Sequence, residues 1–193
     1  MLLATNDLLN TPVMSLQTGA EIAVAGSPVI DPSNFHILAY ELYGDKLDIE
    51  PAFLKVEDIR ELSDIGFIVD SSDEVIALDD IVVGKESYLQ PIQLEGMRVI
   101  DDHHNKIGKV ERVIMTTETF EVEQLYIRQP FLKSFSDTEL IIHRRQIIDV
   151  TKEAIVVRAP TVKEVEKNAK QAFINPFHQA SPQQPESVKS DRH

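Results

Sequence analysis

The feature of this sequence that most constrains its fold is a weak internal repeat. Two pairs of segments align, at offsets of 85 and 88 positions respectively: 21–42 with 106–127, and 53–71 with 141–159. Few residues are identical, but apolar positions recur, so that Phe35 aligns with Phe120 and Ile37 aligns with Val122. An internal repeat of this kind predicts two structural units built on one plan.

Both copies have the composition of short β-strands separated by turns. Stretches such as FHILAYELY and FEVEQLYIR are rich in β-branched and aromatic residues, and clusters of Asp, Asn, Ser, Gly and Pro lie between them. Short, evenly spaced strands in units of about 70–80 residues are typical of a small barrel or a strongly curled sheet. Pro28 falls inside one expected strand and cannot donate a backbone hydrogen bond, so we expect an edge or a bulge there. The sequence therefore predicts an all-β fold.

The second copy resembles the PRC-barrel family over three stretches: LEGMRVIDDHHNKIGKVERVIM, TTETFEVEQLYI and IIHRRQIIDVTKEAIVV. The first copy is similar but looser, with Ala23 where the family usually has glycine. The resemblance implies two tandem small PRC-like β-barrels, which we expect at residues 1–84 and 89–160. It carries no catalytic signature.

The C-terminal segment differs from the repeats and predicts a short helix over residues 161–175. Thr161 is followed three residues later by Glu164, which is a capping-box arrangement. Val162, Val165 and Phe173 then recur at helical spacing and share one face. A helix this short is marginal by itself, so its apolar face should dock on a barrel or on a partner. Residues 176–193 are polar and rich in proline, which predicts a disordered tail.

The charge of the chain is divided unevenly between its halves. Residues 1–90 contain 17 Asp and Glu against 4 Lys and Arg, a net charge of −13, whereas residues 91–193 contain 15 of each. Nucleic-acid affinity comes largely from neutralising phosphates with basic residues, so the first half is a poor candidate for contact with RNA or DNA. The chain has no cysteine, which excludes disulfides and thiol catalysis. It also shows no secretory signal pattern and no long apolar run, and we expect a cytoplasmic protein.

The stretch DDHHNKIG, residues 101–108, concentrates carboxylates and imidazoles and raises the question of a metal site. Adjacent histidines such as His103 and His104 point in different directions, whereas zinc ligands are usually two to four residues apart and come from at least two segments. Asp and Asn favour turns because they bond to the nearby backbone. We interpret the stretch as a turn between two strands. We predict no metal site, no cofactor site and no catalytic residue in this chain.

A basic corner in the second copy is the sharpest candidate for a binding surface. His143, Arg144 and Arg145 interrupt two apolar pairs, and Arg128 and Lys133 are nearby in sequence. Such a corner can hold phosphate, RNA or an acidic protein segment. The alternative is that the arginines pair within the chain, with Glu139, Asp149 or the acidic first half.

We therefore predict a non-catalytic adaptor or assembly module that binds another macromolecule, with a protein as its partner. The resemblance supports this, since PRC-barrel proteins act as interaction modules, one of them on a ribosomal protein. An RNA- or ribosome-associated module that uses the basic corner is the alternative. The predicted partner-binding residues are Arg128, Lys133, His143, Arg144, Arg145, Val162, Val165 and Phe173.

Overall fold

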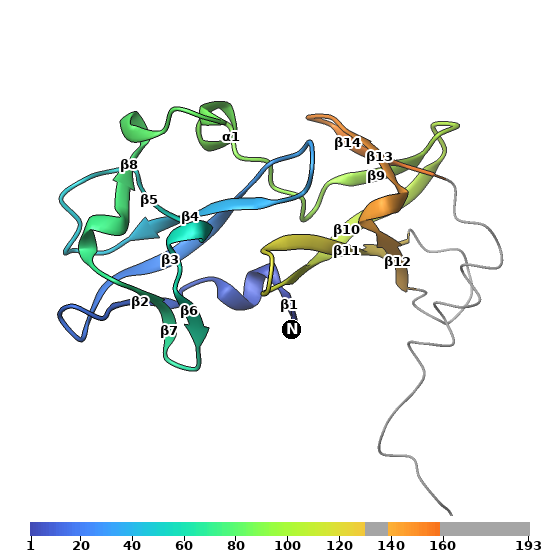
Figure 1. Ribbon diagram of the computed structural model, residues 1–193. Helices are drawn as coiled ribbons and strands as arrows, with labels where there is room; N and C mark the ends of the chain where they lie inside the picture. Colours follow the sequence, from blue (N-terminus) through green and yellow to red (C-terminus); the bar gives the residue numbers. More distant parts are fainter. Residues whose placement is uncertain (130–138, 159–193) are drawn as a thin grey trace, which may run out of the picture. The chain divides into compact units, whose positions relative to one another are not determined.

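The computed structural model describes residues 1–129 and 139–158 of the chain. Within these residues the protein consists of two seven-stranded sheets, which Figure 1 shows as two curled ribbons of strands. The sheets belong to one compact unit. The strands of the first sheet, in spatial order, are β6 (Glu61–Ser63), β7 (Gly66–Val69), β2 (Pro12–Ser15), β3 (Ala20–Ile30), β4 (Ile37–Tyr43), β5 (Ala52–Lys55) and β8 (Val75–Ala77).

The second sheet repeats this order with its own strands. These are β13 (Ile147–Val150), β14 (Ala154–Val157), β9 (Arg98–Asp101), β10 (Lys106–Thr116), β11 (Glu121–Arg128) and β12 (Glu139–His143), with β1 (Leu2–Ala4) added alongside β10. Helical structure in the described residues is limited to single turns. One α-helix, α1, spans Lys85–Leu89, and 3₁₀ turns span Thr5–Leu8, Val56–Asp58, Ser72–Glu74, Leu78–Asp80 and Arg144–Gln146.

Six strands of the two sheets correspond in order, β2 to β7 with β9 to β14, which confirms the all-β fold and agrees with the internal repeat; among the described strands, β8 and β1 have no counterpart. In each, a long strand pairs antiparallel with both of its neighbours, as β3 does with β2 and β4, and β10 with β9 and β11. In each, the first strand of the repeat also pairs in parallel with the last one, β2 with β7 and β9 with β14. The shared plan therefore includes strand direction as well as strand order.

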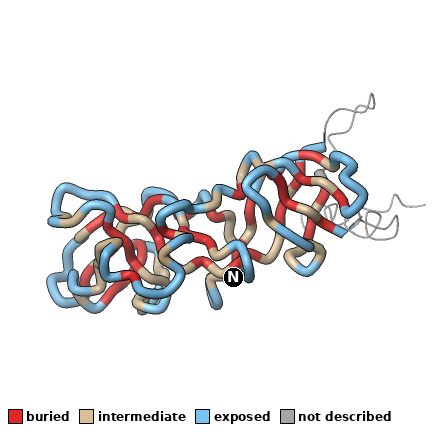
Figure 2. The backbone as a smooth tube through the Cα atoms, turned by 90° about the horizontal axis from the view of Figure 1, so that it is seen from above, coloured by how far each residue is buried: buried red, intermediate tan, exposed pale blue. Residues whose placement is uncertain are grey.

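Apolar side chains fill the interior of both sheets, and the buried positions recur along most strands (Figure 2). The aligned pairs Leu42 and Ile127, and Leu54 and Ile142, are buried in both repeats. The conserved spacing thus reflects interior positions that must be apolar in each copy. Pro28 lies next to a register shift in the pairing of β3 with β4. This part of β3 extends beyond the residues that pair with β2. The predicted bulge is therefore confirmed.

The segment before the first repeat packs on the second repeat, and the segment before the second repeat packs on the first. The N-terminal strand β1 pairs antiparallel with the far end of β10, and Leu2 lies opposite Thr116. Conversely, Tyr88 of α1, which precedes the second repeat, packs with Val29 of β3 and Phe53 of β5. The ring of Tyr88 meets that of Phe53 edge-on, at 5.2 Å between centroids.

Backbone conformation also repeats at the entrance to each unit. Asn10 (φ 62°) and Gly96 (φ 81°) both adopt left-handed conformations. Their amides donate to the equivalent carbonyls of Ala25 and Val110, each at 2.8 Å. Asparagine tolerates this region better than most residues with a Cβ, so it can replace the glycine of the second copy.

The two repeats differ at the position where the first has Ala23 and the second has Gly108. In the second repeat, a Cβ on Gly108 would lie 2.3 Å from the carbonyl oxygen of Arg128, so glycine is required. In the first repeat, Ala23 is buried, and its Cα would lie 3.5 Å from a Cβ on Gly44, an ordinary van der Waals distance. The proposed boundaries at residues 84 and 89 stay predictions. The predicted helix 161–175 and tail 176–193 lie outside the described residues.

Candidate functional site

The stretch DDHHNKIG contains the turn between β9 and β10, as predicted. The Asp101 carboxylate accepts hydrogen bonds from the backbone amides of His103 (2.9 Å) and Asn105 (2.7 Å), and from the Asn105 side-chain amide (2.9 Å). His104 adopts a left-handed conformation (φ 64°) at the tip. The bonds from Asn105 and His103 lower the pKa of Asp101. The acidic side chain is therefore used to hold the turn.

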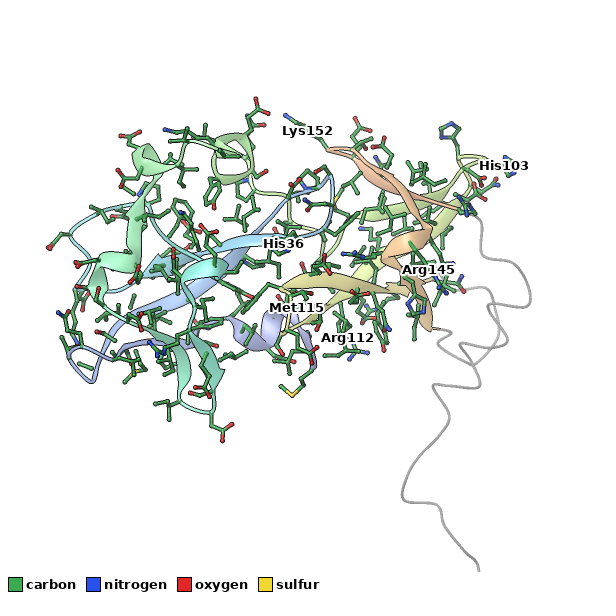
Figure 3. The ribbon with its side chains drawn as sticks, in the orientation of Figure 1. His36, His103, Arg112, Met115, Arg145 and Lys152 are labelled. Carbon is green, nitrogen blue, oxygen red and sulfur yellow. The ribbon has the colours of Figure 1, made fainter. Side chains whose placement is uncertain are left out.

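The described part of the chain contains no group of three or more His, Asp or Glu side chains placed to hold a metal ion. His103 lies at the tip of its turn, far from His36 between the repeats (Figure 3). Across residues 1–129 and 139–158, no helix has the length and apolar character needed to span a membrane.

Arg144 of the basic corner is engaged within the chain. It begins the 3₁₀ turn after β12, and its guanidinium lies 3.1 Å from the carboxylate of Glu121 at the start of β11. The hydrogen bond from Arg144 lowers the pKa of Glu121, and a bond from Thr119 and the charge of His36 act in the same direction. Pairing of this arginine within the chain was one expected alternative. Its partner, however, is neither Glu139 nor Asp149, and it does not belong to the acidic first half.

Three of the other predicted binding residues are described by the structure, and four are not. Arg128 at the end of β11 forms an ion pair with Glu111. Arg145 is exposed on the turn after β12 (Figure 3), and the half-buried His143 ends that strand. Lys133, Val162, Val165 and Phe173 lie outside the described residues. Within the described residues the corner therefore presents two exposed arginines, Arg145 and Arg128, and both Arg128 and the half-buried Arg144 have carboxylate partners.

The two repeats meet through residues that are equivalent in the repeat. The amide of Ile37 donates to the carbonyl of Phe120 (2.8 Å), and the amide of Val122 donates to the carbonyl of Phe35 (2.9 Å). His36 is thereby paired with Glu121 as an antiparallel bridge. Both phenylalanines have positive φ angles, 62° for Phe35 and 52° for Phe120. We call this contact, residues 35–37 with 120–122, the inter-repeat bridge.

Side chains around the inter-repeat bridge join the two interiors. Tyr40 of β4 is fully buried, and its hydroxyl contacts the sulfur of Met115 in β10 at 3.5 Å. Its ring also meets that of Phe120 edge-on, at 6.4 Å between centroids. Sequence reasoning aligned Phe35 with Phe120 but did not foresee that they touch across the repeats. The only signal for this was the recurrence of an aromatic residue directly after a polar turn.

A second surface lies on the outside of the second sheet. Two rows of outward-facing residues cross β10, β11 and β12, and we call them together the β10–β12 outer face: Ile114, Gln124 and His143 in one row, and Arg112, Tyr126 and Ile141 in the other. The guanidinium of Arg112 lies 4.7 Å from the ring centroid of Tyr126, which is a cation–π contact (Figure 3 shows Arg112 pointing away from the sheet). Sequence reasoning named His143 here but neither Arg112 nor Tyr126.

The equivalent face of the first repeat is closed by the chain itself. Val29 and Ala39 are buried there, packed with Ile81 and Tyr88 from the segment that follows β8. Their counterparts in the second repeat, Ile114 and Gln124, are only partly buried. The two repeats therefore differ most in how far this face is withdrawn from solvent.

Comparison with known proteins gives a family match for the second repeat. No curated protein matches the chain. Residues 93–164, which comprise the second repeat, match the PRC-barrel domain. The matched segment contains β9 to β14 and the turn that carries Arg144 and Arg145. Residues 93–164 of this chain therefore form a domain of the PRC-barrel family.

Proposed function

We propose that this protein is a non-catalytic adaptor or assembly module, and that a partner protein binds the β10–β12 outer face. PRC-barrel domains serve in general as interaction or assembly modules, which supports the general class. The observation that carries the choice of face is the difference between the repeats: Val29 and Ala39 are buried, and Ile114 and Gln124 are not. We include in the proposal that the module works in the cytoplasm.

The chemistry of the face suits a protein partner. Tyr126 offers a large ring with a polar end, and Arg112 stacks on it. Tyr and Arg are enriched among residues that dominate binding energy. The Tyr ring buries a large contact area at low conformational-entropy cost. Ile114 adds aliphatic surface in the neighbouring row. A partner with an apolar side chain and a nearby carboxylate would satisfy this combination.

RNA binding has less support from the same residues. Arg144 and Arg128 each lie against a carboxylate, Glu121 and Glu111 respectively. A phosphate would have to displace these acids or accept their repulsion. Arg145 and Arg128 are the exposed arginines in the described part of the corner. The charge of Arg128 is offset by Glu111, so the two supply little of the charge neutralisation on which nucleic-acid binding depends.

The test is affinity capture with the full chain as bait, followed by measurement of the affinity of each recovered protein for purified variants. Replacing Tyr126 by alanine should weaken a direct partner by about 30-fold or more, the effect expected when a central aromatic contact worth about 2 kcal/mol is lost. Tyr43→Ala is the matched control, because Tyr43 is an exposed tyrosine on β4, the strand equivalent to β11. Equal binding by both variants would refute the proposed face.

RNA titrations on the same proteins separate the alternative. Binding that falls steeply with added salt and is lost in Arg145→Ala would favour the RNA-associated function. The adaptor proposal expects no such salt-dependent RNA affinity and a protein partner that is sensitive to Tyr126→Ala.

A further inference from the structure

The inter-repeat bridge has the geometry of a contact in a symmetric dimer. Its two hydrogen bonds, from Ile37 to Phe120 and from Val122 to Phe35, exchange into one another when the repeats are interchanged. His36 and Glu121 are also equivalent positions, 85 residues apart, and they face each other at the centre. In a two-fold interface the same patch serves both partners, and each contact occurs twice. This is the arrangement that one chain holds here internally.

The segments that precede the repeats follow the same rule. Leu3 of β1, in front of the first repeat, pairs with Met115 of the second repeat. Tyr88 of α1, in front of the second repeat, packs with Val29 of the first. Each repeat is therefore contacted by the segment that leads into the other, β1 by strand pairing with β10 and α1 by packing of its Tyr88 side chain.

The connection between the repeats is anchored at Tyr88 but exposed on either side of α1. Val82 and Val83 are 91% and 85% exposed, and Gly84 adopts a left-handed conformation (φ 71°). After α1, residues 90–93 have neither helix nor strand. Extension at residues 90–93 gives up the hydrogen bond from Lys152 to Gln90 and the packing of Ile92, but leaves the strand pairing inside each repeat in place.

From these observations we propose that a second copy of this chain binds through the same interface by exchange of whole repeats. In the exchanged dimer, the first repeat of each copy packs against the second repeat of the other. The inter-repeat bridge then forms twice between chains, with the same residue pairs as in the single chain. Exchange of identical elements in this way is a low-cost route to a dimer, because no new surface is required.

The balance between the two forms is set by the connection. A short flexible linker gives the tethered partner an effective concentration on the order of millimolar. The single-chain form therefore dominates in dilute solution, and exchange becomes favourable as the protein concentration approaches this value. Shortening the connection prevents the repeats from closing on one another within one chain, which lowers the concentration needed for exchange.

The absence of cysteine makes a direct test available. His36 and Glu121 form a pair whose flanking residues carry the hydrogen bonds, so their Cα atoms are expected to be about 4.5 Å apart. That separation suits a disulfide. In the double variant His36→Cys with Glu121→Cys, oxidation of a dilute sample should give a disulfide within one chain. Failure to form it would overturn the proposed geometry.

The decisive sample mixes two full-length single variants, His36→Cys and Glu121→Cys, unfolded together and refolded at near-millimolar concentration. Exchange predicts a disulfide-linked dimer of the two different variants on a non-reducing gel. If the double variant cross-links within the chain but the mixture gives no linked dimer, the proposal is wrong. A linked dimer from either single variant alone would show like repeats pairing with each other, and that too would overturn it.

Light scattering on the cysteine-free chain gives an independent measurement should the substitutions impair folding. Deletion of residues 90–93 should move the midpoint between monomer and dimer from the order of millimolar to the order of micromolar concentration. A midpoint that does not respond to the deletion would contradict exchange through this connection.

Discussion

His36 and Glu121 face each other across the contact between the two repeats, although they are 85 positions apart in the chain. They occupy equivalent positions in the two repeats, but one side chain is basic and the other is acidic. Glu121 also holds Arg144 at 3.1 Å, so the bridge is tied to the basic corner of the second repeat. Substitutions at this pair therefore report on both features.

Replacing Glu121 by glutamine should lower the stability of the protein at neutral pH. Arg144 lowers the pKa of this carboxyl in the folded state. A carboxyl with a lowered folded-state pKa stabilises the protein above its unfolded-state pKa of about 4.3, and this contribution is lost as the pH falls through the folded-state pKa. We expect a loss of about 0.2–1 kcal/mol near pH 7, the range for partly exposed ion pairs.

Urea unfolding of wild type and Glu121→Gln at several pH values tests this. The unfolding free energies of the two proteins should converge in acid, because residue 121 is then neutral in both. Glu118→Gln serves as the control, since Glu118 is largely exposed and pairs with the terminal amino group of Met1. A difference between wild type and Glu121→Gln that persists unchanged in acid would contradict the assignment.

The glycines of the second repeat should differ sharply in their tolerance. Gly108→Ala should destabilise the protein by about 1–3 kcal/mol, because the new Cβ would lie 2.3 Å from the Arg128 carbonyl oxygen. Gly96→Asn should cost little, because no heavy atom lies within 4 Å of a Cβ there and Asn10 occupies the equivalent position with the same backbone hand. Thermal unfolding of both variants would show the contrast, and equal effects would refute the explanation.

Removal of the Tyr40 hydroxyl should be nearly neutral despite its complete burial. Its contact is the thioether of Met115 at 3.5 Å, and sulfur is a weak acceptor. Burial raises the pKa of Tyr40, so the hydroxyl is protonated at neutral pH. We expect Tyr40→Phe to change the unfolding free energy by less than about 1 kcal/mol, whereas Tyr40→Ala should cost about 3–5 kcal/mol, by analogy with the loss of a buried Phe or Trp. Comparable losses in the two variants would indicate a stronger role for the hydroxyl.

Asp101→Asn should loosen the turn between β9 and β10 in a pH-dependent way. The bonds from Asn105 and His103 favour the ionised carboxylate and lower its pKa. The stabilisation is therefore present above the unfolded-state pKa and disappears as the pH falls through the lower folded-state value. Amide hydrogen exchange at His103 and Asn105 should quicken in the variant near pH 7. Asp102→Asn, a neighbouring exposed position, should leave exchange unchanged.

The positions that had to be apolar were readable from the sequence because they recur in both copies. Leu42 and Ile127 aligned without being identical, and both proved to be buried. The turn at residues 101–105 was also predictable, because Asp and Asn bond to the backbone a few residues away. Local chemistry and repeated patterns thus identified the strands and the turn.

Contacts between distant segments were not readable in the same way. Nothing near Arg144 in the sequence indicates that its partner is Glu121 rather than Glu139 or Asp149. The same holds for Arg112 and Tyr126, which meet only because β10 and β11 pair in one register. A side chain's partner across a sheet depends on register shifts, and single-sequence patterns do not specify those.

The pairing of β1 with β10 has a practical consequence for anyone who divides this protein into fragments. A recombinant piece that begins at residue 90 would lack the strand that covers Ile114 to Thr116, and would show those backbone groups to water. A synthetic octapeptide of residues 1–8 added to such a piece should occupy the vacant edge. Binding of a labelled peptide of residues 1–8 would then report whether the second repeat is folded.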